Sequence, residues 1–278
     1  MTLRQALQRA SEILDSHHIE SASLTAEVLL RHVLGISRVR LFQDSDTEIT
    51  SEQYARFAIL VERHIQGEPV AYLTGRKEFY GLDFHVDRSV LIPRPETEFL
   101  VEKALEIAGG KNKFTIADIG TGSGAIAITL AINLPGVVIY AVDISAQAIM
   151  TARENAVRHL VEARIRFIQG DLLQSLPEPV DLIIANLPYV RQADLAEPSI
   201  KYEPRTALDG GPDGLDVIRR FIPQISSKIK TGGTVLMEIG MGQSEPVVAL
   251  LRMQYPQAKL DLFKDFNGIE RVVRMKLH

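Results

Sequence analysis

A carboxamide and a proline stand directly after an apolar run in the second half of the chain. The run covers residues 180–185 and is followed by Asn186, Leu187, Pro188 and Tyr189. Short apolar runs are typical of buried parallel strands, whose carboxyl ends form the active-site edge of α/β sheets. The Asn side-chain carbonyl, backbone carbonyls held extended by the proline and an aromatic ring could together grip a planar NH2 group. Asn-x-Pro also forms ordinary turns, so the tetrapeptide alone supports either interpretation.

A glycine-rich loop lies upstream, between a strand pattern and a helix pattern. Residues 114–116 are rich in β-formers, residues 125–131 are typical of a helix, and Asp118 opens the run D-I-G-T-G-S-G between them. Glycines permit a tight turn and the close approach of a ligand to the backbone. The spacing G-x-G-x-G, without a lysine, matches neither the dinucleotide fingerprint nor a P-loop, so a phosphate cradle is disfavoured. Alternatively, the loop has a purely structural role and only packs the helix against the strand.

Acidic residues end the next two strand patterns. Residues 137–142 lead into Asp143, and the run 165–168 is followed shortly by Asp171 and Leu172. An ionised Asp143 could accept protons from both hydroxyls of a ribose, as acidic residues do at this position in dinucleotide-binding sheets. Asp171 could accept the amino group of adenine, and Leu172 could cover its ring. Either Asp could instead cap the following helix.

These motifs resemble those of the class I methyltransferases that use S-adenosylmethionine, and residues 91–98, L-I-P-R-P-E-T-E, narrow the resemblance. With D-I-G-T-G-S-G at 118–124 and N-L-P-Y at 186–189 in the same order, the chain is similar to the protein-(glutamine-N5) methyltransferases that modify peptide chain release factors. The resemblance spans nearly the whole chain. Many members carry proline where this chain has Leu187, a difference that leaves the Asn carboxamide and the Pro188 carbonyl intact.

The resemblance implies an α/β fold, with a doubly wound, seven-stranded, Rossmann-like class I methyltransferase domain. It implies transfer of a methyl group from S-adenosyl-L-methionine to the N5 atom of the glutamine in the Gly-Gly-Gln motif of class 1 release factors, with S-adenosyl-L-homocysteine as the product. The residues it implies for the cofactor are Gly120, Thr121, Gly122, Ser123, Gly124, Asp143, Asp171, Leu172 and Asn186. Those it implies for catalysis are Asn186, Pro188 and Tyr189, and Leu187, Arg94 and Glu96 join them in binding the substrate.

The chemistry of this reaction needs few charged side chains. The sulfonium is already a strong electrophile, so the enzyme mainly aligns a nitrogen behind the methyl carbon and stabilises developing positive charge. Carbonyl oxygens of Asn186 and Pro188 could hold both hydrogens of the glutamine amide and orient its nitrogen. Tyr189 could pack beside the substrate or serve as a core aromatic. Arg94 and Glu96 could order the pocket wall, or Glu96 could simply belong to the first turn of a helix.

Length and composition predict a soluble, two-domain cytoplasmic enzyme. The chain has 278 residues, a formal net charge of −4, no cysteine and histidines without a ligand pattern. Disulfides, thiolate metal sites and a cysteine nucleophile are thereby excluded, and metal dependence is not predicted. The acidic balance argues against binding nucleic acid through its phosphates. Neither a signal-peptide core nor a run of roughly 20 apolar residues is present, so no membrane partner is expected.

The first third of the chain reads as a small all-α bundle. Apolar residues recur at helical spacing over 3–14 and over 26–34, where Gly35 is a plausible helix stop. A third helix is predicted from a capping box of Thr50 and Gln53. We therefore predict a helical substrate-recognition domain over 1–74, a hairpin linker over 75–95 that includes a short hairpin at 79–86, and a methyltransferase domain over 96–278.

Helix and strand patterns alternate from residue 96, as a parallel doubly wound sheet requires. A fifth strand is predicted over 234–239, and two closing strands, 259–263 and 271–275, are expected to pair as an antiparallel hairpin at the sheet edge. The stretch 191–216 is too irregular for an element. It is either a loop that covers the substrate or a plain surface excursion.

Three other functions remain open from the sequence. An adenine-N6 nucleic-acid methyltransferase would use the same Asn-x-Pro-Tyr logic on the exocyclic amine of a base. The acidic balance, the helical domain in place of an evident basic region, and residues 93–96 stand against it, so no nucleic-acid substrate is expected. A noncatalytic adapter that keeps the cofactor fold comes next, and an NAD-dependent oxidoreductase comes last because the glycine spacing is wrong.

Overall fold

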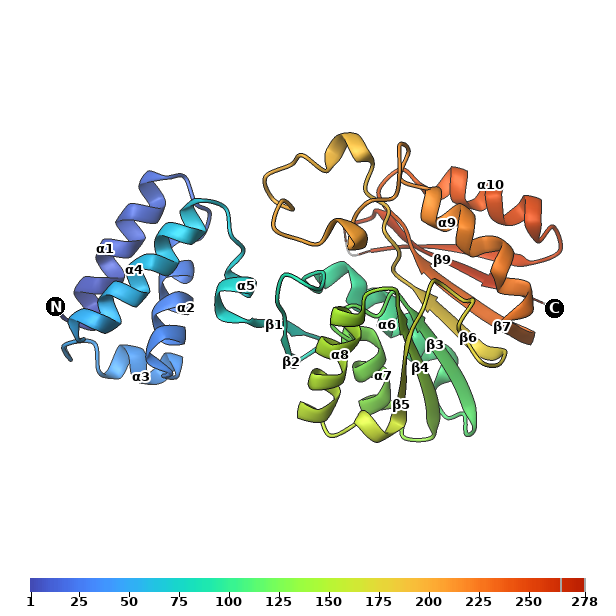
Figure 1. Cartoon of the computed structure of the whole chain (residues 1–278), viewed down its shortest axis with the longest axis horizontal. Helices are drawn as coiled ribbons and strands as arrows, with labels where there is room; N and C mark the ends of the chain where they lie inside the picture. Colours follow the sequence, from blue (N-terminus) through green and yellow to red (C-terminus); the bar gives the residue numbers. More distant parts are fainter. Residues whose placement is uncertain (266, 278) are drawn as a thin grey trace. The chain divides into compact units, whose positions relative to one another are not determined.

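The computed structural model describes residues 1–265 and 267–277, which divide into two compact units, Met1–Arg76 and Lys77–His278. Each unit has a hydrophobic core of its own, as separate domains require. Figure 1 shows helices alone in most of the first unit and a sheet flanked by helices in the second.

The first unit is helical. Its helices are α1 (Leu3–Ser16), α2 (Ala22–Leu34), α3 (Arg38–Gln43), α4 (Ser51–Ile65) and α5 (Val70–Thr74). The capping box of Thr50 and Gln53 is confirmed at the start of α4, and Gly35 ends α2 in the left-handed conformation. Helices α3 and α5 were not predicted, because six and five residues are too few to show a helical period.

A two-stranded hairpin opens the second unit. Strands β1 (Arg76–Phe79) and β2 (Leu82–His85) are joined by Tyr80 and Gly81, which both have positive φ, as a tight hairpin turn of the primed type requires. Phe79 and Phe84 are buried in the same apolar cluster as helix α6 (Pro95–Ala108). The hairpin thus packs into the core of the second unit.

One side chain, Asn155, fastens this hairpin to the glycine loop. Asn155 is fully buried in α8 (Ala146–Arg158), where its Oδ1 accepts the backbone N–H of His85 at 2.7 Å. Its Nδ2 donates to the carbonyls of His85 and Ser123, each at 2.9 Å. A single amide therefore satisfies three backbone groups from two distant segments.

We expect Asn155→Ala to destabilise the second unit by about 2–4 kcal/mol, because it leaves these backbone groups without their partner. Urea denaturation monitored by circular dichroism measures the loss. Asn133→Ala is the matched control, since the exposed Asn133 side chain donates to Thr129 O within its own helix. Equal midpoints for the two variants would contradict the role assigned to Asn155.

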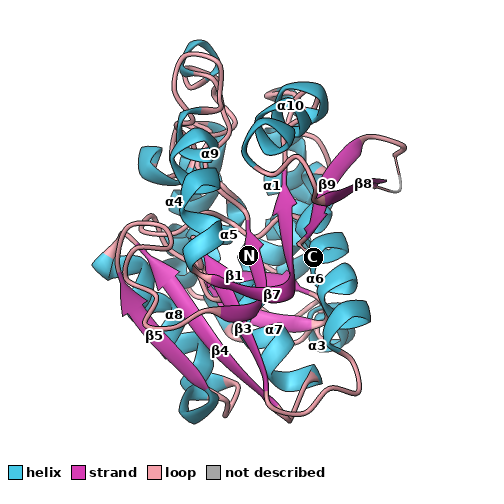
Figure 2. Ribbon diagram, turned by 90° about the vertical axis from the view of Figure 1, so that its right-hand side faces the viewer, coloured by secondary structure: helices cyan, strands magenta, loops and turns pink. Residues whose placement is uncertain are grey.

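The second unit is built on a seven-stranded sheet in the order β5-β4-β3-β6-β7-β9-β8. The strands are β3 (Phe114–Ile119), β4 (Val137–Asp143), β5 (Ile165–Gln169), β6 (Val180–Ala185), β7 (Ile229–Glu238), β8 (Lys259–Lys264) and β9 (Glu270–Lys276). The first five are parallel, and β8 and β9 form the predicted antiparallel hairpin at the edge, with β9 against β7 (Figure 2). Strand β7 begins five residues earlier than the predicted 234, because Ile229 pairs with Val180 before a register shift.

Helices cover both faces of this sheet. Helices α6, α7 (Ala125–Asn133) and α8 contribute to the apolar cluster on one face, while α9 (Asp216–Phe221) and α10 (Ser244–Gln254) contribute to the cluster on the other (Figure 1). Short 3-10 turns lie at Glu162–Arg164, Gln192–Asp194, Arg205–Ala207 and Ile222–Ser227. The predicted doubly wound α/β fold is confirmed.

The strand order places the two predicted motifs side by side. Strands β4 and β5 lie on one side of β3, whereas β6 and β7 lie on the other, so the direction of winding reverses between β3 and β6. Ligands of open α/β sheets bind at such a reversal, beyond the carboxyl ends of the strands. Here the glycine loop follows β3 and the Asn-Leu-Pro-Tyr segment follows β6.

Candidate active site

A cavity of about 280 Å³ opens at this reversal and is lined by residues of the second unit. The predicted cofactor residues that line it are Gly120, Gly122, Asp143, Asp171 and Leu172. Asn186, Leu187 and Pro188 form another part of its wall. The structure therefore gathers residues that follow four different strands. The first and last of them, Gly120 and Pro188, are 68 positions apart in sequence.

The three loop glycines serve different purposes. A Cβ on Gly120 would approach the Asn186 carbonyl oxygen to 3.3 Å, so this glycine lets the two motifs lie against each other. A Cβ on Gly122 would meet only the Gly120 carbonyl, at 4.0 Å, so open space lies beside it on the cavity wall. A Cβ on Gly124 would instead press on Ile128 at 2.9 Å, which makes Gly124 a packing residue at the start of α7.

Thr121 and Ser123 lie beneath the loop and do not line the cavity. Both are buried, and the Thr121 hydroxyl donates to Asp118 Oδ2 at 2.7 Å. The Asp118 carboxylate also accepts the backbone N–H of Ala127, although its burial raises its pKa to about 7. These hydrogen bonds fix the conformation of the glycine-rich loop from the side that faces the protein core.

The Asp143 carboxylate is fixed at the end of β4 by backbone donors. The N–H of Gly122 donates to Oδ2 and the N–H of Ser145 to Oδ1, both at 2.9 Å. Burial raises the pKa of Asp143, while these hydrogen bonds and one from Ile144 oppose the rise. Since two carboxylate oxygens offer about four acceptor positions, capacity remains for hydroxyl groups of a ligand.

Asp171 and Leu172 form the neighbouring part of the wall. Asp171 makes an ion pair with Arg220, which also lines the cavity. Leu172 has a φ of 53°, in the left-handed region that β-carbon-bearing residues rarely adopt, and its side chain is buried in the core. Such backbone strain persists where packing enforces it, and it gathers at ligand sites.

The Asn186 carboxamide is oriented by one hydrogen bond. Its Nδ2 donates to the hydroxyl oxygen of Thr97 at 3.1 Å, and Thr97 is buried in the first turn of α6. Because the nitrogen is engaged, the side-chain oxygen is left to accept hydrogen bonds from a bound group. A substrate NH2 group donates hydrogen bonds, so it requires an acceptor such as this oxygen.

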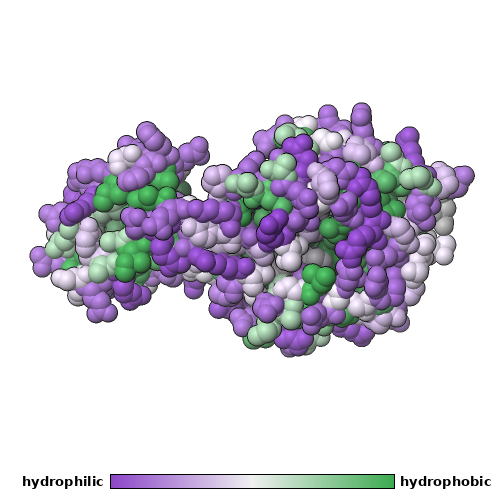
Figure 3. Space-filling view, turned by 45° about the horizontal axis from the view of Figure 1, so that its top comes forward, coloured by the Kyte–Doolittle hydropathy of each residue, from purple (hydrophilic) through white to green (hydrophobic). Residues whose placement is uncertain are grey.

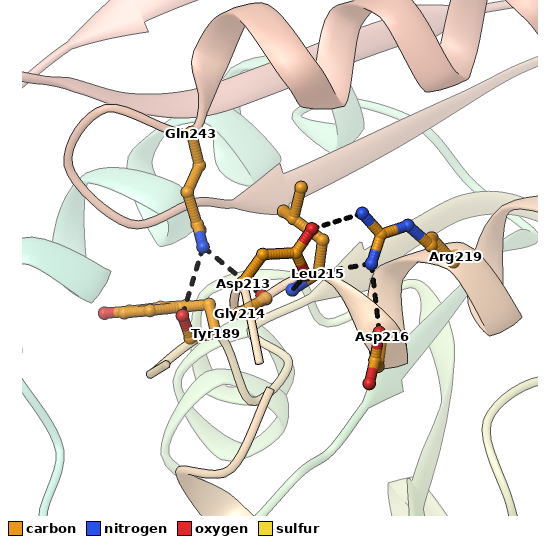
Figure 4. A network of polar contacts seen from close by, with 7 residues as sticks. All are labelled: Tyr189, Asp213, Gly214, Leu215, Asp216, Arg219 and Gln243. Carbon is orange, nitrogen blue, oxygen red and sulfur yellow. Dashed lines mark hydrogen bonds and ion pairs between the residues drawn. The ribbon is translucent and has the colours of Figure 1, made fainter. Parts of the chain in front are cut away.

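Tyr189 lies outside this cavity and lines a neighbouring hollow. Its hydroxyl donates to Glu238 Oε1 at 3.3 Å, and burial raises the pKa of the phenol. Figure 4 shows the Gln243 amide nitrogen donating to the carbonyls of Tyr189 and Gly214, at 3.1 and 3.2 Å. The aromatic residue therefore buttresses the segment that holds Asn186.

Arg94 and Glu96 also lie outside the cavity wall. Arg94 makes an ion pair with the buried Glu203, which additionally accepts the N–H of Ile92 at 3.2 Å. Glu96 lies in the first turn of α6. Arg94 thus ties the segment before α6 to the long loop 191–216.

That loop reaches the site. Thr206, Ala207 and Asp209 line the cavity, and Asp209 forms an isolated parallel bridge with Val190. Two of its short stretches, Gln192–Asp194 and Arg205–Ala207, are 3-10 turns. Part of the loop is therefore cavity wall, which favours the covering-loop interpretation over a plain surface excursion.

Sequence reasoning missed Thr97, Glu203 and Glu238. Thr97 belongs to the quoted run 91–98, but nothing local distinguishes it from other helix-start residues. Glu238 could have been found from sequence, because a carboxylate directly after the apolar residues 235–237 follows the pattern of Asp143. Glu203 gave none, since it lies in an irregular stretch.

The sequence of this chain is similar to those of known proteins. Residues 5–75 match the family described as PrmC N-terminal domain, and residues 95–204 match the methyltransferase small domain. A protein of Koribacter versatilis described as a release factor glutamine methyltransferase is 42% identical over 279 residues, covering 98% of each chain. This chain belongs to the release factor glutamine methyltransferase family. Another relative so described, from Bacillus subtilis, is 37% identical and covers 100% of this chain and 98% of its own.

Solved structures agree on the fold of this family member. A methyltransferase from Pyrococcus furiosus aligns with a TM-score of 0.54 at 15% identity, over 77% of this chain and 96% of its own. The ribosomal protein L11 methylase from Lactobacillus delbrueckii aligns with a TM-score of 0.52 at 23% identity, over 69% and 84%. Both support a class I methyltransferase fold for the second unit. Among residues 1–265 and 267–277, no helix is long and apolar enough to cross a membrane.

Proposed function

We propose that this protein methylates the N5 atom of the glutamine in the Gly-Gly-Gln motif of class 1 release factors, in the cytoplasm, with S-adenosyl-L-methionine as donor. The observation that carries the proposal is the Asn186 carboxamide, whose nitrogen is engaged by Thr97 so that its oxygen is left for a substrate amide. Membership of the family supports the same substrate.

The residues of the cavity fit the cofactor. Asp143 would accept the ribose hydroxyls, Asp171 would accept the adenine amino group, and Leu172 would cover the ring. The open space beside Gly122 admits a ligand against the backbone. When bound, S-adenosylmethionine supplies a methyl carbon that bonds to the amide nitrogen as the carbon–sulfur bond breaks, its electron pair staying on sulfur and a proton leaving the nitrogen.

The substrate end needs positioning more than a base. A glutamine amide nitrogen is a weak nucleophile, because its lone pair is delocalised into the carbonyl. The Asn186 side-chain oxygen and the Pro188 carbonyl would accept its two hydrogens, orient the nitrogen and favour the positive charge that develops on it. Leu187 and Pro188 would close the cavity around the amide.

The helical unit would recognise the release factor. An apolar hollow of about 170 Å³ lies on this unit between α1 and α4, with Ile13, Tyr54 and Val61 in its lining. Hydrophobic side chains, green in Figure 3, reach the surface of the unit.

The test is a labelling experiment. The protein is incubated with methyl-labelled S-adenosylmethionine and either a purified class 1 release factor or adenine-containing DNA, and the label is located by mass spectrometry. A release factor whose Gly-Gly-Gln glutamine is replaced by glutamate is the matched control. Label on that glutamine, absent from the control, is the expected result, whereas label confined to adenine would replace the proposal with an adenine-N6 methyltransferase.

A further inference from the structure

Helix α9 and the 3-10 turn after it, Ile222–Ser227, hold the chain segment that follows β5. Three side chains at intervals of four residues make this contact, namely Arg220, Gln224 and Lys228. Their partners, in the same order, are the Asp171 carboxylate, the Leu173 N–H and the Leu176 carbonyl. The segment 171–176 is therefore anchored along its length to this stretch of chain.

The same helix forms the cavity wall beside Asp171. Val217 and Arg220 are three residues apart on α9, so they lie on one face of it, and both line the cavity. The Arg220 Nη2 donates to Asp171 Oδ2. Within the part of the chain that the structure describes, Asp171 Oδ1 has no hydrogen-bond partner. Because a carboxylate accepts through both oxygens, Oδ1 is left to accept a hydrogen bond from a ligand.

We propose that Arg220 is a positioning residue, which fixes the Asp171 carboxylate with Oδ1 toward the 6-amino group of adenine and so makes the cofactor site selective for this group. The proposal rests on the proposed function for the identity of the ligand. The guanidinium holds Oδ2, which restricts rotation of the carboxylate, and it compensates a charge that stands beside the apolar Val217.

The composition of the wall explains why the selectivity depends on this pair. Ile144, Leu172 and Val217 are apolar, so they contribute to the binding of any purine ring alike. An ionised carboxylate can only accept hydrogen bonds, and the 6-amino group of adenine donates them. A carboxylate that is already held in place loses less conformational entropy when it binds the amino group than a mobile one does.

The decisive experiment compares two ligands by isothermal titration calorimetry. One is S-adenosyl-L-homocysteine, and the other is its analogue whose purine carries hydrogen in place of the 6-amino group. The wild-type protein should bind the first at least about tenfold more tightly, because a hydrogen bond to a charged group is lost with the second. In Arg220→Met this ratio should fall to about threefold or less, mainly through weaker binding of the adenine ligand.

This ratio separates a positioning role from a merely structural one. If Arg220 only braced α9, Arg220→Met would weaken the binding of both ligands equally and leave the ratio at its wild-type value. A wild-type ratio in Arg220→Met would therefore overturn the proposal. The Arg220 side chain is 55% exposed, so the variant should fold, which thermal unfolding checks.

The neighbouring arginine provides the matched control. Arg219 lies on the same helix, pairs with Asp213 and Asp216 (Figure 4) and does not line the cavity. Arg219→Met should therefore keep the wild-type ratio of the two affinities. A ratio that falls as far in Arg219→Met as in Arg220→Met would refute a specific role of Arg220.

A double-mutant cycle tests whether Arg220 acts through Asp171. Asp171→Ala should abolish the preference for the adenine ligand, and adding Arg220→Met to it should leave the ratio unchanged. A further change of the ratio in the double variant would contradict the proposal.

These measurements need no release factor, so they are independent of the methylation assay. If the release factor is not methylated but the ratio depends on Arg220, the proposed function fails while the role of Arg220 stands. If the release factor is methylated and the ratio in Arg220→Met is that of the wild type, the role of Arg220 fails while the proposed function stands.

Discussion

Replacement of Asn186 by alanine is expected to lower the rate constant for methyl transfer by about 100- to 1,000-fold, the effect of removing one preorganised group from an active site. Asn186 lies on the cavity wall, and its carboxamide nitrogen donates to the Thr97 hydroxyl, which orients the side chain. Without it, the substrate nitrogen loses both an acceptor that aligns it and a dipole that favours its developing charge. Single-turnover kinetics with saturating cofactor and a release factor measure the change.

The same variant should keep most of its cofactor affinity, which isothermal titration calorimetry reports. Asn133→Ala is a suitable control for the rate, because the Asn133 side chain is exposed and bonds to Thr129 O within α7. If Asn186→Ala bound the cofactor far more weakly yet transferred methyl groups at the normal rate, the assignment of Asn186 to the substrate would be wrong.

Replacement of Asp143 by alanine is expected to act on the other half of the site and to weaken cofactor binding by about 100-fold or more. A hydrogen bond to a charged group contributes about 1.5–3 kcal/mol, and this carboxylate would accept two ribose hydroxyls. Since the group lies away from the reacting atoms, the rate at saturating cofactor should change little. Calorimetry gives the dissociation constant, and a rate measurement at rising cofactor concentration separates the two effects.

Two further variants sharpen this result. Asp143→Asn retains one side-chain acceptor for the backbone donors Gly122 and Ser145, so it distinguishes loss of the ribose contacts from collapse of the loop. Asp261→Ala removes an acidic residue of β8 that pairs with Arg274, at the sheet edge. Comparable cofactor affinities in Asp143→Ala and Asp261→Ala would remove Asp143 from the binding site.

The cofactor half of the site could be predicted from sequence because its parts follow a local rule. Each predicted residue comes within a few positions of the end of an apolar run, and parallel strands bring their carboxyl ends to one edge. Asp143, Asp171 and Asn186 lie on one cavity wall for this reason. Gly124 shows the limit of the rule, because only the packing of Ile128 reveals that this glycine serves the helix.

The rest of the site depends on contacts that no local pattern encodes. Tyr189 follows Asn186 in sequence yet reaches Glu238, because β6 lies beside β7. Thr97 is recognisable only once the first turn of α6 is seen against the end of β6. The short helices α3 and α5 were not predicted for a different reason, because so few residues do not show a helical period.

The two halves of the cavity differ in how much chain separates their parts. Asp143 and the Gly122 amide it accepts are 21 residues apart, so the ribose end is assembled from nearby chain. Thr97 and Asn186 are 89 residues apart, so the amide end exists only after a long loop has closed. Closing longer loops costs more entropy and slows folding. We therefore expect the ribose end of the cavity to form earlier in folding than the amide end, which depends on more of the fold.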